Sequence, residues 1–366
     1  LNATGALSDS TGQAIGDSTG TDVLATVDIN GTKAVTMGAI TSTVLADVSI
    51  DAADGDLTYA AIGGDSTKLD SVTLTAAAGA IAGNAAIGKS DNTGVLDVTA
   101  SAKNAIDLAA IISTKLGDIS INNTNSVAKT IDVDVVGANA TEIGDITISG
   151  SGDIAVGLIG KATAIATSVG TIGITSTLGD ITLAATNSIG TKDSTGLAVD
   201  LTAKTFIGAN NDATAAAVIE NAGGNIEASI AGAAKANVNY TAKTSGIVNL
   251  TATNTGGLTS TVTNVGTVGA GETSTINMGA GTNSLTVDGA VDTLVINGST
   301  KTDTVTFAAG SDSKVATIAL GAGTNTVDYT AHTSASTITD TSSDNGVVIN
   351  LGSSTLTFDS GQTYAS

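Results

Sequence analysis

Short stretches in which apolar and polar residues alternate recur along the chain, each preceded by a turn that contains glycine. The motif is clearest in GDISI at 117–121, GDITI at 144–148, GDIAV at 152–156 and GDITL at 179–183. An alternation of period two turns one face of a strand toward a core and the other toward solvent. Glycine followed by Asp is typical of tight turns. The motif therefore predicts a corner followed by a short, half-buried strand.

The C-terminal part of the chain repeats this arrangement with different residues. MGAGTNSLTVD at 278–288 and LGAGTNTVDYT at 320–330 each join a glycine turn to alternating apolar residues. The turn glycines of this part are Gly279, Gly298, Gly321 and Gly352. Coils of about 20 residues fit a parallel β-solenoid, in which each coil stacks its strands on the coil before. The two similar stretches then mark one corner that is used again two coils later.

The composition supports this fold, because the chain has no proline and few large side chains. Proline cannot donate the backbone hydrogen bond that a stacked strand needs, and there is none among the 366 residues. Four Tyr, three Phe, two Met and no Trp leave the core to Ala, Val, Ile, Leu and Thr, which suit a narrow interior. A string of antiparallel β-sandwiches, the alternative, would show proline and aromatic residues at its corners. An all-β parallel β-solenoid is therefore the predicted fold.

Two stretches depart from the strand pattern. Residues 101–117 and 210–224 have apolar residues near helical spacing, with Ser101 and Asp212 as candidate N-caps and Gly117 as a candidate end. They predict one or two short helices that cap or decorate the solenoid, or else irregular coils. The pattern alone does not decide between these alternatives.

The second of these stretches is also the predicted domain boundary. Thr becomes denser after it, and the GAGTN motif replaces the GD motif. The predicted organisation is an N-terminal and central solenoid with GDI-type repeats over 1–209, a helical break over 210–224 and a C-terminal solenoid over 225–366. The least charged window, 154–175, is interrupted by Lys161 and rich in Gly, Thr and Ser, so it predicts strands and no membrane insertion.

The charge of the chain limits its partners. Thirteen basic residues, all Lys, face 34 acidic ones, and the formal net charge is -21. Such a surface repels nucleic acid and anionic lipid and attracts cations. No nucleic-acid partner is therefore expected. A hydrophobic content of 41% indicates that the chain folds.

Catalytic chemistry has few candidate residues. The chain has no Cys and one His, His332, which excludes disulfides and Cys-ligated metal sites. A single His among many hydroxyl residues is more often a surface residue than a general base. The sequence therefore predicts a protein that is not an enzyme.

The glycine turns of the C-terminal part resemble a known repeat, the RTX nonapeptide G-G-x-G-x-D-x-U-x. The matching residues are Gly279, Gly281, Asn283 and Leu285 in the first turn and Gly321, Gly323, Asn325 and Val327 in the second. Together with the Thr, Ala, Gly and Asp content, they make the chain similar to RTX-related surface-layer (S-layer) proteins of Gram-negative bacteria. The resemblance implies an exported β-solenoid that forms a two-dimensional lattice on lipopolysaccharide with Ca²⁺. The motif covers only the C-terminal part of the chain.

Both turns depart from the RTX repeat at the residue that would bind calcium. Asn283 and Asn325 stand where the repeat has an Asp, and Met278 and Leu320 replace its first Gly. An amide side chain brings no charge to a cation, but it can both donate and accept hydrogen bonds. At these two turns the sequence therefore predicts a ladder of Asn or Thr side chains that holds the turn by hydrogen bonds.

Carboxylates elsewhere predict a calcium site. DAADGD at 51–56 places Asp51, Asp54 and Asp56 around a glycine, an oxygen-rich turn of the kind that Ca²⁺ prefers. Asp132 and Asp134 in IDVDVV fall on one face of a strand, where the two carboxylates can share a cation. The alternative for each is a solvated acidic turn or strand face. Ca²⁺ is the predicted cofactor, with these five residues as its candidate ligands.

Three functions remain open. The first is a structural protein of the extracellular cell surface that self-assembles into an S-layer lattice, with copies of itself as partners and possible contact to lipopolysaccharide or another glycan through a region not identified. The second is a secreted adhesin or filament-forming solenoid. The third is an ice-binding solenoid, indicated by Thr-x-Thr at 73–75, 261–263 and 355–357. That function needs Thr-x-Thr in successive coils, and in the sequence it appears only sporadically.

Overall fold

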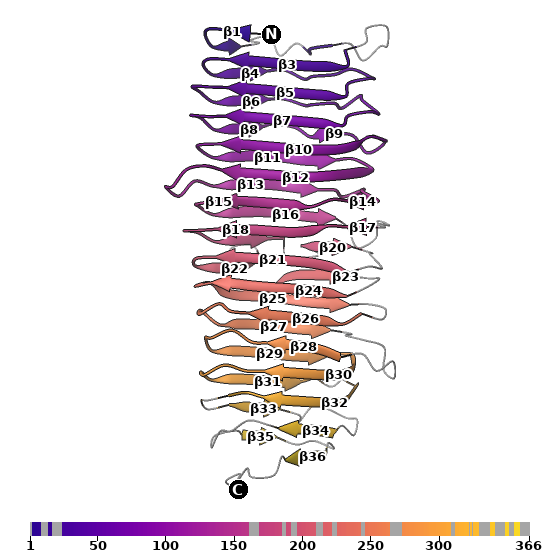
Figure 1. Ribbon diagram of the computed structural model, residues 1–366, viewed down its shortest axis with the longest axis vertical. Helices are drawn as coiled ribbons and strands as arrows, with labels where there is room; N and C mark the ends of the chain where they lie inside the picture. Colours follow the sequence, from indigo (N-terminus) through magenta and orange to yellow (C-terminus); the bar gives the residue numbers. More distant parts are fainter. Residues whose placement is uncertain are drawn as a thin grey trace. The chain divides into compact units, whose positions relative to one another are not determined.

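The computed structural model divides the chain into two compact units, Leu1–Leu183 (unit 1) and Ala184–Ser366 (unit 2). The residues that the structure describes form strands, turns and bends, without a helix (Figure 1). These residues are 2–8, 14–16, 24–160, 168–184, 188–191, 196–209, 215–221, 225–242, 246–263, 273–308, 312–321, 323, 325–328, 337–340, 348–350 and 355–358.

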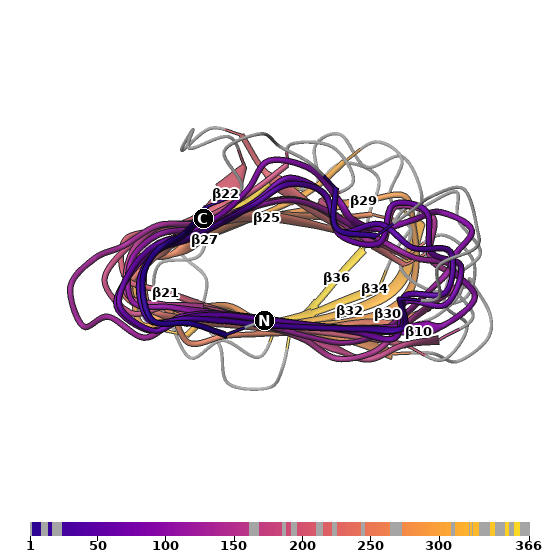
Figure 2. The ribbon, with the colours of Figure 1, turned by 90° about the horizontal axis from the view of Figure 1, so that it is seen from above.

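Unit 1 is built from two parallel sheets. Sheet A contains β1 (Asn2–Ala3), β3 (Thr26–Gly31), β5 (Asp47–Ala52), β7 (Ser71–Ala76), β10 (Val95–Ala102), β12 (Lys115–Asn123), β14 (Glu142–Ile143), β15 (Ile146–Gly150), β17 (Ser168–Val169) and β18 (Thr171–Ser176). Sheet B contains β2 (Leu7–Ser8), β4 (Val35–Met37), β6 (Leu57–Tyr59), β8 (Ile81–Gly83), β9 (Ile87–Gly88), β11 (Ile106–Ile112), β13 (Ile131–Val136), β16 (Ile154–Gly160) and β19 (Ile181–Leu183). Seen from above, successive coils of unit 1 lie over one another as two layers joined at corners (Figure 2).

Unit 2 has the same arrangement. Its sheet A contains β21 (Leu197–Ala203), β24 (Ile226–Gly232), β26 (Val248–Ala252), β28 (Thr273–Asn277), β30 (Ala290–Asn297), β32 (Asp312–Ala319), β34 (Thr337–Asp340) and β36 (Thr355–Phe358). Its sheet B contains β20 (Ile189–Thr191), β22 (Phe206–Ala209), β23 (Ala217–Asn221), β25 (Lys235–Ala242), β27 (Leu258–Thr263), β29 (Asn283–Asp288), β31 (Asp303–Phe307), β33 (Thr326–Asp328) and β35 (Val348–Asn350).

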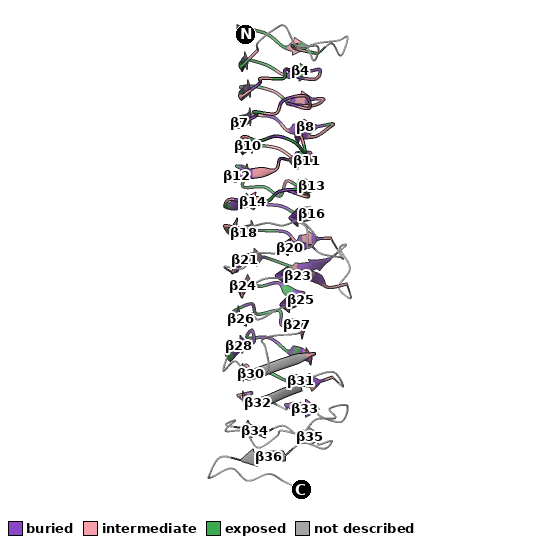
Figure 3. Ribbon diagram, turned by 90° about the vertical axis from the view of Figure 1, so that its right-hand side faces the viewer, coloured by how far each residue is buried: buried purple, intermediate pink, exposed green. Residues whose placement is uncertain are grey.

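The core is a set of inward rows in which one apolar residue lies over the next. In sheet A of unit 1, Ile50 pairs with Leu74, which pairs with Ala100, and Ile121 continues the row to Ile148. All five are buried, and the residues between them face outward (Figure 3). Burying one Ile or Leu side chain stabilises the fold by about 1.5–3 kcal/mol. The alternation in the sequence therefore becomes a continuous thin core.

The predicted parallel β-solenoid is confirmed. Every strand pairing described is parallel, for example β12 with β15 and β29 with β31. Residues that bond across one coil are 20 apart at Asn283 and Asp303, and 27 apart at Asp118 and Asp145. The longer coils carry extra residues at a corner.

The predicted corner glycines lie between strands where the structure describes them. Gly279, Gly298 and Gly321 each fall after a strand of sheet A and before a strand of sheet B. Gly352 lies outside the described residues. The GAGTN turns are therefore corners of the solenoid, as predicted.

The helix predicted at 101–117 as one alternative is wrong. These residues belong to β10, β11 and β12, with Ser101 and Gly117 inside strands. Buried Ile106, Leu108 and Ile111 pair with apolar residues of β13. Two adjacent half-buried alanines in β11 shift the alternation by one residue, which imitates helical spacing.

The second predicted helix is wrong where it can be examined. Of 210–224, residues 215–221 are described, and they contain β23, which pairs with β25 in parallel. The two units divide after Leu183, whereas the boundary predicted at 210–224 falls inside unit 2. Stacking partners, which a local pattern does not contain, decide the structure of both stretches.

Candidate functional site

The three carboxylates predicted to bind calcium at 51–56 have separate surroundings. Asp51 is half-buried on the outward side of β5. Exposed Asp54 forms an ion pair with Lys33, whose hydrogen bond and charge keep the pKa of Asp54 below its usual value. The Asp56 carboxylate accepts a hydrogen bond of 2.8 Å from the Ala80 backbone N–H in the next coil. Two of the three carboxylates are therefore engaged in bonds of their own.

The other predicted pair lies on one strand face, as the sequence indicates. Asp132 and Asp134 are exposed on β13, and Asp107 of β11 is the direct neighbour of Asp132. Partial burial raises the pKa of Asp132 above its usual value, and the charges of Asp107 and Asp134 raise it further. We call these three residues the acidic patch. In the part of the chain that the structure describes, no three His, Cys, Asp or Glu side chains are grouped to hold a metal ion.

Three Asp residues of unit 1, two of them in GD motifs, form a hydrogen-bonded row along sheet A. The Asp97 carboxylate accepts from the backbone N–H of Asp118 at 2.8 Å, and the Asp118 carboxylate accepts from that of Asp145 at 3.1 Å. Asp145 in turn accepts from Thr171 N–H at 2.7 Å. We call Asp97, Asp118 and Asp145 the aspartate ladder. Each carboxylate pairs a backbone donor of the next coil, and the pairing of β10 with β12 shifts register beside Asp97 and Asp118.

The glycine of the motif makes room for this bond. A Cβ at Gly144 would lie 2.7 Å from the Gly117 carbonyl carbon and 2.8 Å from the Asp118 carboxylate. The corner from sheet A to sheet B has the same bond, since Asp153 accepts from the backbone N–H of Asp180 at 3.0 Å. The GD motif is therefore a coil-stacking element in which Asp supplies the acceptor and Gly supplies the space.

Unit 2 solves the same problem with buried amides. Asn283, 2% exposed, accepts from the Leu258 N–H at 2.8 Å and donates to the carbonyls of Gly279 and Gly281. Asn325, fully buried, accepts from the backbone N–H of Asp303 in the preceding coil at 2.9 Å. The prediction that side-chain hydrogen bonds hold these two turns is confirmed. We call Asn254, Asn283, Asp303 and Asn325 the asparagine ladder.

One member of the asparagine ladder is a carboxylate that the sequence did not single out. Asp303 is fully buried, and it accepts hydrogen bonds from the Asn283 side-chain amide at 2.7 Å and from the Ser299 N–H at 2.6 Å. Burial raises its pKa above the usual value, although these donors act in the opposite direction. Its sequence context, TDTVTF, shows only an ordinary strand.

The outward side of sheet A in unit 1 carries two columns of uncharged polar side chains. Register places each residue beside its counterpart in the next coil. The first column is Ser49, Thr73, Thr99, Ser120 and Thr147, and the second is Thr75, Ser101, Asn122, Ser149 and Thr175. We call the two columns together the hydroxyl face. The aspartate ladder borders the first column, because each of its members lies two residues before a column residue.

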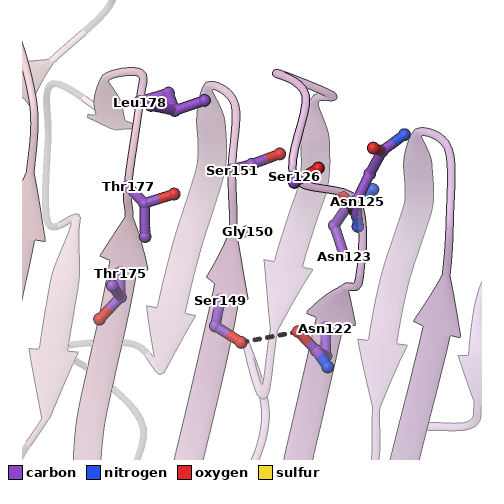
Figure 4. Close-up of a pocket in the computed structure, with 10 residues that line it drawn as sticks. All are labelled: Asn122, Asn123, Asn125, Ser126, Ser149, Gly150, Ser151, Thr175, Thr177 and Leu178. Carbon is purple, nitrogen blue, oxygen red and sulfur yellow. Dashed lines mark hydrogen bonds between the residues drawn. The ribbon is translucent and has the colours of Figure 1, made fainter.

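At its C-terminal end the second column opens into a hollow of about 360 Å³ (Figure 4). We call it the polar groove. Within it the Ser149 hydroxyl donates to the Asn122 side-chain oxygen at 3.0 Å. The residues that line it are Asn122, Asn123, Asn125, Ser126, Ser149, Gly150, Ser151, Thr175, Thr177 and Leu178. None of them is charged, and they come from three successive coils.

The sequence pattern did not indicate the hydroxyl face or the polar groove. Asn122 and Ser149 are 27 residues apart, whereas Ser71 and its bonded neighbour Asp47 are 24 apart. Because the coil length changes, the columns have no fixed period in the sequence. The Thr-x-Thr at 73–75 is the one part of the hydroxyl face that the sequence indicated.

The remaining predicted features give no further site. His332 lies outside the described residues. The window 154–175 contains β16 and β18 where it is described, as predicted. The described residues include no helix with the length and apolar character needed to cross a membrane. In comparisons with protein-family models, with curated proteins and with solved structures, nothing matches this chain.

Proposed function

We propose that this protein is a non-enzymatic structural component of the extracellular cell surface, which assembles with copies of itself into a two-dimensional lattice. The observation that carries the proposal is how polar side chains are used. In both units, polar side chains bond one coil to the next, as Asp118 and Asn283 do. The outward faces then repeat from coil to coil. A stiff element with a repeating surface suits regular contacts between identical copies.

Charge makes such assembly dependent on cations. A chain with a net charge of -21 repels its own copies at contact within a Debye length of about 8 Å at physiological ionic strength. The acidic patch places like charges on neighbouring strands of unit 1. Its carboxylates form no closed site within one described chain, so a Ca²⁺ ion bound there would be shared with a second copy.

Light scattering under titration with a chelator, at fixed ionic strength, tests this function. We expect large particles with Ca²⁺, and soluble subunits that keep their β-structure once the ion is removed. A variant with Asp107→Asn, Asp132→Asn and Asp134→Asn should need more Ca²⁺ to assemble, whereas the control Asp65→Asn, Asp91→Asn and Asp200→Asn should not. Particles whose size is independent of free Ca²⁺ would show that the cation-bridged lattice is wrong.

The second candidate, a secreted adhesin or filament, is favoured by the polar groove. An adhesin needs a surface that recognises something other than its own copies, and a hollow lined by amide and hydroxyl groups is such a surface. Negative-stain images separate the two candidates. Sheets that form with Ca²⁺ support the lattice, and single particles or fibres under the same conditions support the adhesin.

A further inference from the structure

We infer that the hydroxyl face and polar groove of unit 1 bind a neutral polysaccharide, with the sugar chain running across successive coils. This binding is independent of lattice formation, so the two proposals can fail separately. It involves residues of unit 1 alone.

The spacing of the hydroxyl face suits a repeating ligand. Neighbours within a column are separated by the distance between paired strands, about 4.8 Å, and the two columns by two residues along a strand, about 6.6 Å. Ser, Thr and Asn side chains each donate and accept hydrogen bonds. A polysaccharide presents hydroxyl groups, which also donate and accept, at a regular repeat along its chain. The face therefore offers one set of partners per coil.

The polar groove adds an apolar contact to these hydrogen bonds. Sugar rings have a polar rim of hydroxyls and an apolar side formed by C–H groups, so they need both kinds of neighbour. Leu178 lines the groove and is 49% exposed, and Val127, which follows the groove residue Ser126, is 63% exposed. Among the described residues, they are two of the three large apolar side chains that are exposed. Leu178, which lines the groove, and Val127, next in sequence to a lining residue, provide apolar surface for the C–H side of a ring.

Two hydrogen bonds connect the backbone at Val127 and Leu178 through Ser151, in the coil between them. The Ser151 hydroxyl donates to the Val127 carbonyl at 2.7 Å, and the Leu178 N–H donates to the Ser151 carbonyl at 3.0 Å. The apolar surface therefore follows the stacking direction, as the columns of the hydroxyl face do. Asn122 and Thr175 offer their polar groups beside it (Figure 4).

Charge selects the class of polysaccharide. No Lys lines the polar groove, and the aspartate ladder, with Asp97, Asp118 and Asp145, borders the hydroxyl face. A sugar with carboxylate, sulfate or phosphate groups would meet negative charge without a cationic partner. A neutral polysaccharide has no charged group for these carboxylates to repel.

Ice is the competing ligand, because Thr-x-Thr and similar pairs stand in register on β7, β10, β12 and β15. Two features favour the sugar. The columns mix Ser, Thr and Asn side chains of different length, and the polar groove hollows the face where a crystal plane would need it flat. Ice binding is therefore an outcome to be tested beside the proposal.

Co-sedimentation of the full chain with insoluble cellulose, chitin and β-1,3-glucan, in a chelator that prevents lattice assembly, tests the proposal. We expect binding to at least one of these three probes, and none to phosphocellulose, which is insoluble and anionic. Leu178→Ser and Thr175→Lys, made separately, should each weaken that binding about tenfold, equivalent to about 1.4 kcal/mol. Thr259→Lys, an exposed Thr on β27 of unit 2, is the matched control and should bind as the original protein does.

Leu178→Ser and Thr175→Lys both change residues at the surface, so circular dichroism should show unchanged β-structure. If one of the two variants fails to fold, the other still tests the proposal. The proposal is overturned if none of the three neutral probes binds, or if both variants bind as tightly as the control. It is also overturned if the protein lowers the freezing point of a seeded ice crystal and Thr175→Lys abolishes that effect while the probes do not bind. Failure of sugar binding leaves the Ca²⁺-dependent particle size as a separate result.

Discussion

Unit 1 and unit 2 pair similar backbone groups with different side chains. In unit 1 the aspartate ladder is exposed, and Asp118 accepts one hydrogen bond from the coil that follows. In unit 2 the asparagine ladder is buried, and Asn283 bonds to one backbone N–H and two carbonyls. Both rows connect each coil to its neighbour through side chains that lie beside the strands.

The difference follows from the chemistry of the two side chains. An ionised carboxylate only accepts hydrogen bonds, and it is costly to bury, so Asp suits an exposed corner where a backbone N–H needs a partner. An amide both donates and accepts without charge, so Asn suits a buried corner where N–H and carbonyl groups both need partners. The aspartate ladder and the three Asn residues of the asparagine ladder follow this rule, whereas Asp303 is a buried carboxylate that Asn283 and Ser299 supply with donors.

The buried ladder should be the more sensitive of the two. Asn283→Ala leaves the Leu258 N–H and the carbonyls of Gly279 and Gly281 without that partner inside unit 2. An unpaired buried polar group costs about 1–3 kcal/mol, so we expect the free energy of unfolding to fall by about 3–5 kcal/mol. Urea denaturation measures this free energy of unfolding. Ser284→Ala, at the exposed neighbouring position, should change it by less than about 0.5 kcal/mol, and equal losses in both variants would contradict the ladder's role.

The space that glycine provides in unit 1 should come second. Gly144→Ala places a methyl group 2.7 Å from the Gly117 backbone, so the coils must separate locally, at a cost of about 1–3 kcal/mol. Gly173→Ala in β18 is the control, because its Cβ would meet nothing closer than the Ile146 carbonyl oxygen at 3.9 Å. The control should leave stability unchanged or raise it by about 0.4–1 kcal/mol. Thermal unfolding measures both variants. If Gly144→Ala is as stable as Gly173→Ala or more stable, the space beside Gly144 tolerates a side chain.

The sequence contained most of the fold, because a solenoid is specified locally and then repeated. Each GD or GAGTN motif carries its own turn glycine, its own polar ladder residue and its own alternation. The helical alternative at 101–117 failed because the shifted alternation of β11 imitates a helix. Only the stacking of Ile106 on Ile131 distinguishes the two, and that contact joins different coils.

The candidate sites were harder to predict, because they depend on register between coils. Asp132 and Asp134 lie two residues apart, so their common face could be predicted, but their neighbour Asp107 could not. Asp54 was predicted as a calcium ligand without its ion pair, since Lys33 lies 21 residues away in the preceding coil. Coil lengths vary, so a residue's neighbours in the next coil cannot be counted from the sequence.

The exposed ladder should show a smaller effect than the buried one. Asp118→Ala removes the acceptor for the Asp145 N–H, which water can partly replace because the corner is exposed. We expect a loss of about 0.5–1.5 kcal/mol, the usual net value of one hydrogen bond. Asp118→Asn keeps an oxygen in place and should lose clearly less. Chemical denaturation of both variants decides the point, and equal losses would mean that the carboxylate charge, rather than the hydrogen bond, matters at this corner.

The smallest effect should come from the acidic patch, which opposes folding where the aspartate ladder supports it. Partial burial and the neighbouring Asp107 and Asp134 raise the pKa of Asp132, so the folded state holds this proton more tightly than the unfolded state. The contribution of Asp132 to stability therefore falls as the pH rises from 3.8, the ordinary pKa of Asp, through the raised pKa.

Asp132→Asn removes the charge, and it should raise the free energy of unfolding at neutral pH by a few tenths of a kcal/mol, about the cost of like charges on paired strands. The gain should vanish in acid, below the ordinary pKa, where Asp132 is neutral in both states. Urea unfolding midpoints from acid to neutral pH, without divalent cations, measure this gain in stability. Asp107→Asn should give a similar gain, and the double variant should gain less than the sum, because either change removes the same repulsion. Fully additive gains, or a gain that persists in acid, would show that the two carboxylates do not interact.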